Sequence, residues 1–233
     1  MSLSHRVYDW PPLRIRRSLF FAGGQAFEGG FTSGGAKILT PEPGGRSFLD
    51  LDFAVQKGRD PLISWAMSKI ANGNIFRVPI RCSPQVISAS DLGVNVSNAS
   101  DGVPWAAEGL IPAHSWDNGQ NWAYEIGAVA QAAALEGTTS IVVDMGDLEP
   151  ALSPGHVIGI GDTPHLVADI EWDESVATIE IDPPLRADLS SGAYITFRPT
   201  MLCVAENPES FRGLYGASSL VELGSVRFIE AIV

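Results

Sequence analysis

The chain has 233 residues, of which 45% are hydrophobic and 18% are charged, and its formal net charge is −12 at pH 7. This length and composition suffice for one large β domain or two small ones, and they exclude a disordered tail. The negative charge argues against a general binder of nucleic acids or anionic membranes, because such proteins need a basic surface to displace counterions.

The charges are segregated along the chain. Residues 1–90 carry 11 basic and 6 acidic groups, whereas residues 136–194 carry 12 acidic groups and 1 basic group. Such a shift indicates a separate, solvent-facing acidic module near the end of the chain. The 24 glycines and 16 prolines favour many short strands joined by turns over long helices.

The first predicted element is an extended segment over residues 7–22, in which Pro11 and Pro12 exclude a helix and arginines alternate with apolar residues. Its apolar run at residues 19–22 is too short for a signal-peptide core or a membrane span, so we expect a protein made and used without export. The glycine-rich residues 23–35 predict a flexible turn or a long hairpin loop. They lack the lysine of a phosphate-binding loop.

The next strand is predicted over residues 46–55, where apolar residues alternate with Asp50 and Asp52. These two carboxylates share one face of a strand. A catalytic pair is one interpretation. The favoured one is an exposed polar strand face, because this spacing is typical of amphipathic strands.

One helix is predicted, from Asp60 to about Ala71, with Pro61 at its first position and Gly73 as its stop. Its spacing places Trp65, Met67 and Ile70 in the core against a sheet. A strand follows over residues 75–82, and Pro79 within it predicts an edge strand or a bulge.

Residues 88–124 are rich in serine, asparagine, aspartate and glycine, with tryptophans interspersed. Aromatic rings beside amides and carboxylates suit sugar binding. The favoured interpretation is that the tryptophans anchor the loop to the sheets or to a neighbouring subunit, because tryptophan is enriched at protein interfaces. The candidate interface or glycan contacts are Trp105, Trp116, Asp117, Asn118, Asn121 and Trp122.

Residues 137–198 predict a small barrel or sandwich of five short strands. His156 and His165 lack a further ligand at suitable spacing, so a metal pair is the disfavoured interpretation. The carboxylates at 171, 173 and 174 fit a solvated turn better than acid–base catalysis. The strands are expected at 138–143, 155–161, 165–170, 176–181 and 193–197.

The C-terminal part predicts a strand near residues 201–205, a short helical piece at 209–215 and a long final strand over 221–233. Cys82 and Cys203 both adjoin apolar strand-like runs, so buried free thiols are the favoured state, with a disulfide as the alternative. No cysteine spacing of the metal-binding kind is present.

The order of these pieces resembles a known family. VYDWP, the glycine-rich stretch, PGGRSFLDLDF and FRVPIRC resemble the first part of tail proteins from long-tailed bacteriophages. The segments EGTTSIVVD, LSPGHVIGIGDTPHLVADI and ATIEIDPPLRADLSSGAYITFRPT resemble a small β domain of phage tail and virion proteins. Together they resemble the distal tail proteins of siphovirus-like tail tips.

This resemblance implies a β-sandwich core with one short α-helix, plus an inserted small β-barrel-like module. The core is expected at residues 1–135 with 199–233, and the acidic module at 136–198. The resemblance further implies a homo-oligomeric ring, usually a hexamer, that joins the tail tube to the hub or baseplate proteins. Such a protein is made in the host cytoplasm and located in the virion.

Three classes of function follow from the sequence. The first is this structural, non-enzymatic ring component, without cofactor, metal site, catalytic residue or membrane span. The second is a carbohydrate-binding tail protein that recognises a host-surface glycan through Trp116 and its neighbours. The third is a glycan-active enzyme, which needs two carboxylates converging in a cleft and is disfavoured because no catalytic signature is visible.

Overall fold

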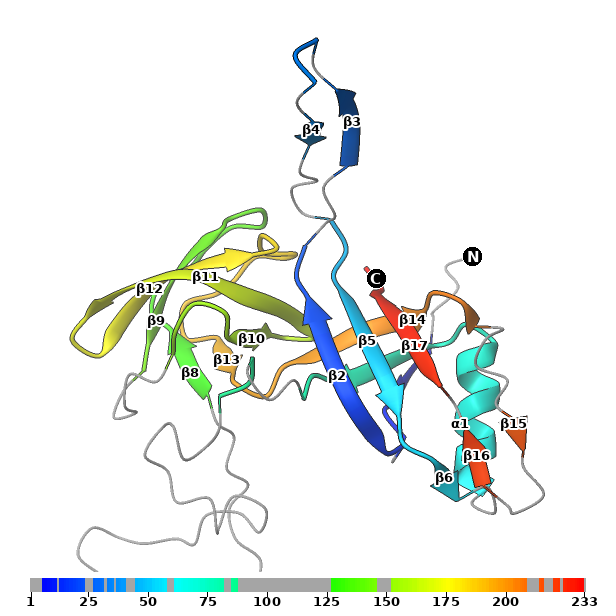
Figure 1. Cartoon of the computed structure of the whole chain (residues 1–233). Coiled ribbons are helices and arrows are strands. Elements are labelled where there is room, and N and C mark those ends of the chain that lie inside the picture. Colours follow the sequence, from blue (N-terminus) through cyan, green and yellow to red (C-terminus); the bar gives the residue numbers. More distant parts are fainter. Residues whose placement is uncertain are drawn as a thin grey trace, which may run out of the picture.

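The computed structural model describes residues 6–11, 13–23, 27–31, 33–35, 37–40, 45–57, 61–81, 85–87, 127–145, 152–208, 214–215, 220–222 and 224–232. These residues form a six-stranded sheet, a six-stranded barrel, two smaller sheets and one helix (Figure 1). The prediction of a mostly β protein with one short α-helix is therefore confirmed.

The six-stranded sheet has the strand order β1-β7-β14-β17-β5-β2. β1 and β7 pair in parallel, and the other neighbours pair antiparallel. The barrel segment lies between β7 and β14 in the chain, so the sheet is assembled from both sides of an insertion. Its strands are β1 (Val7–Asp9), β2 (Ile15–Phe21), β5 (Phe48–Phe53), β7 (Ile75–Pro79), β14 (Thr200–Ala205) and β17 (Ser225–Glu230).

Alternation of apolar and polar residues decides which face of this sheet is buried. In β5, Leu49, Leu51 and Phe53 are buried and the residues between them are half-buried. β14 and β17 repeat the pattern. This period of two places one apolar face against the helix and leaves a polar face outside.

The helix α1 (Pro61–Ala71) packs on the apolar face of the sheet. Its buried side chains are Ile63, Ala66, Met67 and Ile70. Gly73 follows with φ +69°, the left-handed conformation that glycine adopts at helix C-termini. Met67 and Ile70 are core residues as predicted, but the prediction for Trp65 is wrong.

Trp65 lies at the rim of the helix and is 37% exposed. Its ring meets the edge of Tyr8 from β1, with 5.6 Å between the ring centroids. Helical spacing shows which side chains share a face of the helix, but it does not show how much of that face the sheet covers. The short strand β1 ends this side of the sheet, so Trp65 packs on β1 and stays open to solvent.

β7 lies between β1 and β14, so the prediction that Pro79 marks an edge strand or a bulge is wrong. Pro79 is the last residue of β7 and pairs with Thr200 of β14. On its other side β1 pairs only with Ile75–Arg77. Proline is tolerated here because the strand has no neighbour on that side at residue 79.

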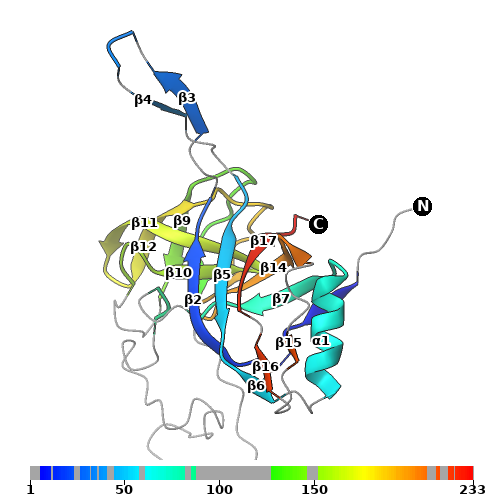
Figure 2. The same cartoon turned by 45° about the vertical axis from the view of Figure 1, so that its right-hand side comes forward.

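Two smaller sheets accompany the six-stranded sheet. β3 (Phe27–Phe31) and β4 (Lys37–Thr40) form a hairpin in the glycine-rich stretch, and this hairpin extends away from the rest of the chain in both views (Figures 1 and 2). β15 (Leu214–Tyr215), β16 (Leu220–Glu222) and β6 (Gln56–Lys57) form the other sheet.

The C-terminal run differs from its prediction in two places. Residues 214–215, expected to be helical, form the strand β15, and residues 209–213 lie outside the described part. The expected long strand over 221–233 is two strands, β16 and β17. Gly224, with φ +67°, separates them and lets the chain pass from one sheet to the other.

The barrel closes through six antiparallel pairings in the order β10-β11-β12-β9-β8-β13, with β13 pairing back to β10. It contains β8, which precedes the expected start of the acidic module at residue 136. The strands are β8 (Gly127–Ala130), β9 (Ser140–Asp144), β10 (Val157–Ile160), β11 (Thr163–Asp173), β12 (Val176–Asp182) and β13 (Tyr194–Thr196). Its interior includes Ile141, Val143, Ile158, Val167, Ile179, Ile195 and Phe197.

Candidate functional site

A buried ion pair joins the barrel to the sheet. Glu230, the last residue of β17, is 4% exposed. Arg186, from the loop after β12, donates from Nε to Oε1 of Glu230 at 3.2 Å and from Nη2 to Oε2 at 3.0 Å. The backbone N–H of Ser47 donates to Oε2 at 2.9 Å, and Nη2 of Arg186 also donates to the carbonyl of Gly45 at 2.7 Å. The buried carboxylate is thus neutralised and saturated with donors.

Gly23 allows close approach at the same junction. It follows β2, and its φ of +65° favours glycine. A Cβ atom at this position would lie 2.8 Å from Oδ1 of Asp182 at the end of β12, which is closer than such atoms come. Its N–H donates to Oγ of Ser47 at 3.3 Å. The left-handed φ is therefore the stronger reason for glycine where the end of β2 meets the barrel, because the exposed side chain of Asp182 could move aside for a Cβ atom.

A second ion pair joins the two units elsewhere. Nε and Nη2 of Arg77 in β7 donate to the two oxygens of Asp162, in the turn between β10 and β11, at 2.6 and 2.9 Å. Thr200 donates to the same carboxylate at 3.1 Å. The hydrogen bond from Arg77 is the main cause that lowers the pKa of Asp162, and the same bond raises the pKa of Arg77.

Apolar contacts continue across the junction. Val157 and Leu166 of the barrel pack in the core of the sheet, and Ile87, which follows β7, packs in the core of the barrel. The N–H of Val157 donates to the carbonyl of Gln85 at 2.7 Å. Both units therefore share core residues as well as two ion pairs, and we expect them to unfold together.

His165 is buried beside the first ion pair. It is 1% exposed, and its Nδ1 lies 2.7 Å from the carbonyl oxygen of Pro183, which makes Nδ1 the protonated nitrogen. Burial is the main cause that lowers the pKa of His165, and the nearby Arg186 lowers it further. The Pro183 carbonyl and Glu230 act in the opposite direction. The folded protein therefore favours the neutral form of the His165 imidazole.

The free energy of unfolding should therefore fall as the pH drops below the ordinary histidine value of 6.5. In that window the unfolded chain binds a proton at His165 that the folded chain, with its lowered pKa, excludes. Urea unfolding at a series of pH values from neutral to mildly acidic measures this slope. We expect His165→Gln to reduce it more than His156→Gln, the same change at a half-buried histidine of the barrel. Equal slopes in wild type and His165→Gln would contradict the assignment.

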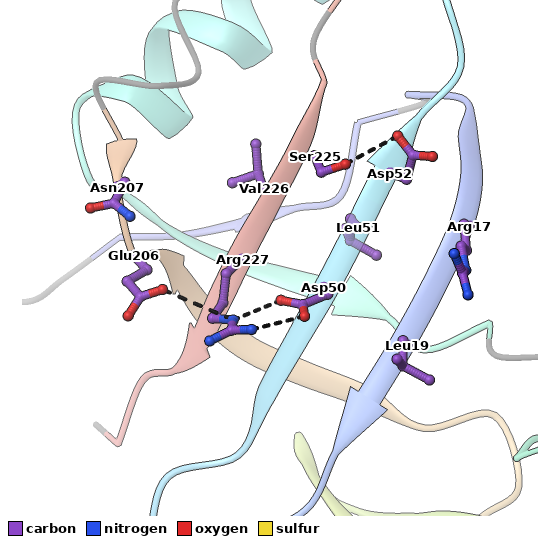
Figure 3. Close-up of a pocket in the computed structure, with 10 residues that line it drawn as sticks. All are labelled: Arg17, Leu19, Asp50, Leu51, Asp52, Glu206, Asn207, Ser225, Val226 and Arg227. Carbon is purple, nitrogen blue, oxygen red and sulfur yellow. Dashed lines mark hydrogen bonds and ion pairs between the residues drawn. The ribbon is translucent and has the colours of Figure 1, made fainter. Parts of the chain in front are cut away.

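The outer face of the sheet carries one of two hollows that are candidate functional sites. Its volume is about 540 Å³, and it lies over β2, β5, β17 and the end of β14 (Figure 3). Figure 3 shows Arg227 between Asp50 and Glu206, with Arg17 and Leu19 on the neighbouring strand. The lining residues are Arg17, Leu19, Asp50, Leu51, Asp52, Glu206, Asn207, Ser225, Val226 and Arg227.

The polar groups of this hollow are largely paired with one another. Nε and Nη2 of Arg227 donate to the two oxygens of Asp50 at 2.8 and 3.0 Å, and this bond is the main cause that raises the pKa of Arg227. Ser225 donates to Asp52 at 3.3 Å. Asp50 and Asp52 share one partly exposed strand face, as predicted. Asp50 is held by an ion pair with Arg227 and Asp52 by a hydrogen bond from Ser225, so both belong to a surface network of polar contacts.

Arg17 is the exception in this network. Its backbone lies opposite Asp52, but no ion pair or side-chain hydrogen bond involves its guanidinium in the described part of the chain. It is exposed, as is Arg16, which occupies the bulge in the pairing of β2 with β5. The edge strand β2 therefore presents two cations that have no ion pair with any described residue.

Apolar side chains accompany these cations. Leu19 and Phe21 alternate with buried Phe20 along β2 and are 40% and 39% exposed. The ring of Phe21 stacks on Phe48 at 4.6 Å, and the guanidinium of Arg227 lies 4.5 Å from the Phe48 ring centroid. β2, β5 and β17 thus form an outer face that is partly apolar and partly charged, which we call the β2 face.

A second groove, of about 580 Å³, lies where the barrel and the sheet meet. Arg81 and Arg198 are exposed at its border, and apolar residues form the rest of its lining: Pro79, Ile80, Val86, Ile87 and Pro199. Neither arginine side chain has an ion pair within the ranges that the structure describes.

The residues that the sequence singled out as candidate contacts lie outside the described residues: Trp105, Trp116, Asp117, Asn118, Asn121 and Trp122. Cys82 also lies outside them, whereas Cys203 is a buried free thiol whose pKa is raised by burial. His156 and His165 have separate partners: Nδ1 of His156 accepts a hydrogen bond from the N–H of Ser153 at 3.0 Å.

The described residues contain no group of three or more potential metal ligands among histidine, cysteine, aspartate and glutamate. None of their helices is both long and apolar enough to cross a membrane.

Comparison with known proteins places the chain in no family. No protein-family model matches it. No curated protein is significantly similar to it in sequence. The class that the fold defines is a two-unit β protein in which a closed barrel is inserted into a mixed sheet, and its function has to be inferred from its surfaces.

The sequence did not predict the three ion pairs that organise these surfaces, Arg77–Asp162, Arg186–Glu230 and Arg227–Asp50. Each of these arginines stands in a strand-like or turn motif next to apolar residues that are buried. This placement was a sequence signal for the arginine itself. The partners are far away in the sequence, so no local pattern identifies them.

Proposed function

We propose that this protein is a structural component of a bacteriophage tail tip. In this proposal, copies of the chain form a ring that joins the tail tube to the hub or baseplate proteins, and the protein belongs to the virion. The motifs VYDWP, PGGRSFLDLDF, FRVPIRC and the PPLR segment, which resemble those of distal tail proteins, support this assignment.

The β2 face is the observation that carries the proposal. An edge strand with exposed apolar side chains offers a surface on which another chain can pair or pack. In this chain, Leu19 and Phe21 are exposed and Arg16 and Arg17 have no partner in the described part. This combination suits a surface that another protein covers, with apolar area for affinity and charge for specificity.

The arrangement of the two units supports the same role. Two ion pairs and shared core residues fix the barrel to the sheet, so the chain holds two different surfaces in a defined relation. A component of a symmetric assembly needs this property, because ring closure requires a constant angle between successive copies. The projecting hairpin of β3 and β4 adds a further extended contact element (Figure 1).

Native mass spectrometry of the purified full chain, combined with negative-stain imaging, tests the proposal. The expected result is a closed ring with a central channel and, by the resemblance, six copies. A chain that stays monomeric over the whole accessible concentration range overturns the proposal for the isolated protein. In that case, glycan binding by the tryptophan-rich segment becomes the hypothesis to test, with Trp116→Ala as the variant.

A further inference from the structure

We propose that the edge strand β2 of one copy, with its exposed Arg16 and Arg17, docks on the outer face of β11 and β12 in the barrel of the next copy. This inference rests on the proposed function and identifies the two surfaces that would meet in the ring. Both surfaces belong to this chain, and they differ from each other in charge and position.

The basic side of the contact is β2. Arg16 projects from the bulge, and Arg17, Leu19 and Phe21 lie on its outer face. The end of the strand is already occupied, because Nε2 of Gln85 donates to the carbonyl of Phe20 at 3.2 Å. The part of the backbone edge of β2 that is open to a partner is therefore its first half, where Arg16 and Arg17 stand without an ion pair among the described residues.

The acidic side is the outer face of β11 and β12. Asp169, Glu171 and Asp173 alternate along β11, so they project from the same side of the strand, and all are exposed. Glu180 of β12 is exposed and pairs directly opposite Asp169. The exposed Glu174 continues the row at the turn.

This row of carboxylates is unfavourable within a single chain. Like charges directly opposite each other on neighbouring strands are destabilising. No cation neutralises Asp169, Glu171 or Glu180 in the part of the chain that is described. A cationic strand placed against this face removes the repulsion, and the row therefore favours a basic partner over water.

The chain itself supplies a partner of the required charge. Residues 1–90 have 11 basic and 6 acidic groups, and residues 136–194 have 12 acidic groups and 1 basic group. No described ion pair joins Arg16 or Arg17 to the barrel carboxylates of the same copy. The two surfaces are thus free to meet between copies. A contact between two different surfaces is heterologous, and such contacts form rings when the rotation closes.

Charge reversal on each side tests the contact. We expect Arg16→Glu/Arg17→Glu, and separately Asp169→Arg/Glu171→Arg/Glu180→Arg, to weaken self-association by about 100-fold or more, since like charges then face each other. Native mass spectrometry and sedimentation measure the effect, and far-UV circular dichroism with thermal unfolding shows whether each variant folds. Arg81→Glu/Arg198→Glu is the matched control, because it changes the net charge as the first variant does at exposed arginines away from the β2 face.

Mixing the two reversed variants in equal amounts gives the decisive result. One variant then has an acidic β2 and an acidic barrel, and the other has a basic β2 and a basic barrel. Alternating copies present opposite charges at every contact, so the mixture should assemble although each variant alone does not. Failure of the mixture to assemble overturns the proposed contact.

The failure of this inference differs from the failure of the proposed function. If the wild-type chain assembles and both reversed variants assemble equally well, the ring proposal stands and the contact is wrong. If the control pair Arg81→Glu/Arg198→Glu abolishes assembly while Arg16→Glu/Arg17→Glu does not, the contact is likewise overturned. A wild-type chain that never assembles overturns both.

Discussion

Replacing Arg186 with methionine should lower the free energy of unfolding by about 3 kcal/mol or more, because it leaves a buried carboxylate without its cation. Glu230 is 4% exposed, and Arg186 donates two of the three hydrogen bonds that its carboxylate accepts from described residues. Methionine keeps much of the side-chain volume, so the expected loss comes from the uncompensated charge. Urea unfolding at neutral pH measures it.

Two control variants separate this effect from a general loss of arginine. Arg198→Met makes the same change at an exposed side chain and should cost less than about 0.5 kcal/mol. Arg186→Met combined with Glu230→Met removes both charges and should be more stable than Arg186→Met alone. A double variant less stable than the single one would contradict the account of the ion pair.

Phe228→Ala should lower the free energy of unfolding by about 3–5 kcal/mol, the usual range for a phenylalanine truncated in a core. Phe228 is fully buried on β17, between β14 and β5. The ring of Trp10 meets it edge-on at 5.5 Å. Because the sheet and the barrel share core residues, we expect the unfolding transition to stay single while its midpoint falls.

Phe21→Ala is the matched control for this prediction. It deletes the same atoms from a ring that is 39% exposed and stacks only on Phe48 among the described aromatic residues. The expected cost is about 1 kcal/mol, since little apolar area returns to water. The two variants should be compared at concentrations where the chain is monomeric. Equal losses would show that Phe228 does not occupy the centre of the core.

Several elements could be predicted because their signals are local. The alternation in FLDLDF and in VATIEID predicts strands with one buried face, and β5 and β12 have that pattern. Proline at 61 and glycine at 73 bound the helix, and the structure has α1 between them. Each of these depends on the conformational preferences of a few neighbouring residues.

Other elements could not be predicted because they depend on distant partners. Trp65 is exposed because the sheet ends at the short strand β1, and Pro79 stands in an interior strand because β1 does not reach it. β8 belongs to the barrel because it pairs with β9 and β13, although its four residues carry little pattern of their own.

The features of the candidate surfaces also divide into those that the sequence determined and those that only the tertiary structure determined. The sequence by itself determined the charge segregation and the shared face of the two carboxylates on β5, but it placed the carboxylates at 171 and 173 in a turn, whereas they lie in β11. Only the tertiary structure decided that β2 is an edge strand, that Arg186 reaches Glu230 and that Arg16 and Arg17 have no partner in the described chain. The physical reason is that charge and periodicity are properties of consecutive residues, whereas pairing and burial depend on which segments the whole fold brings together.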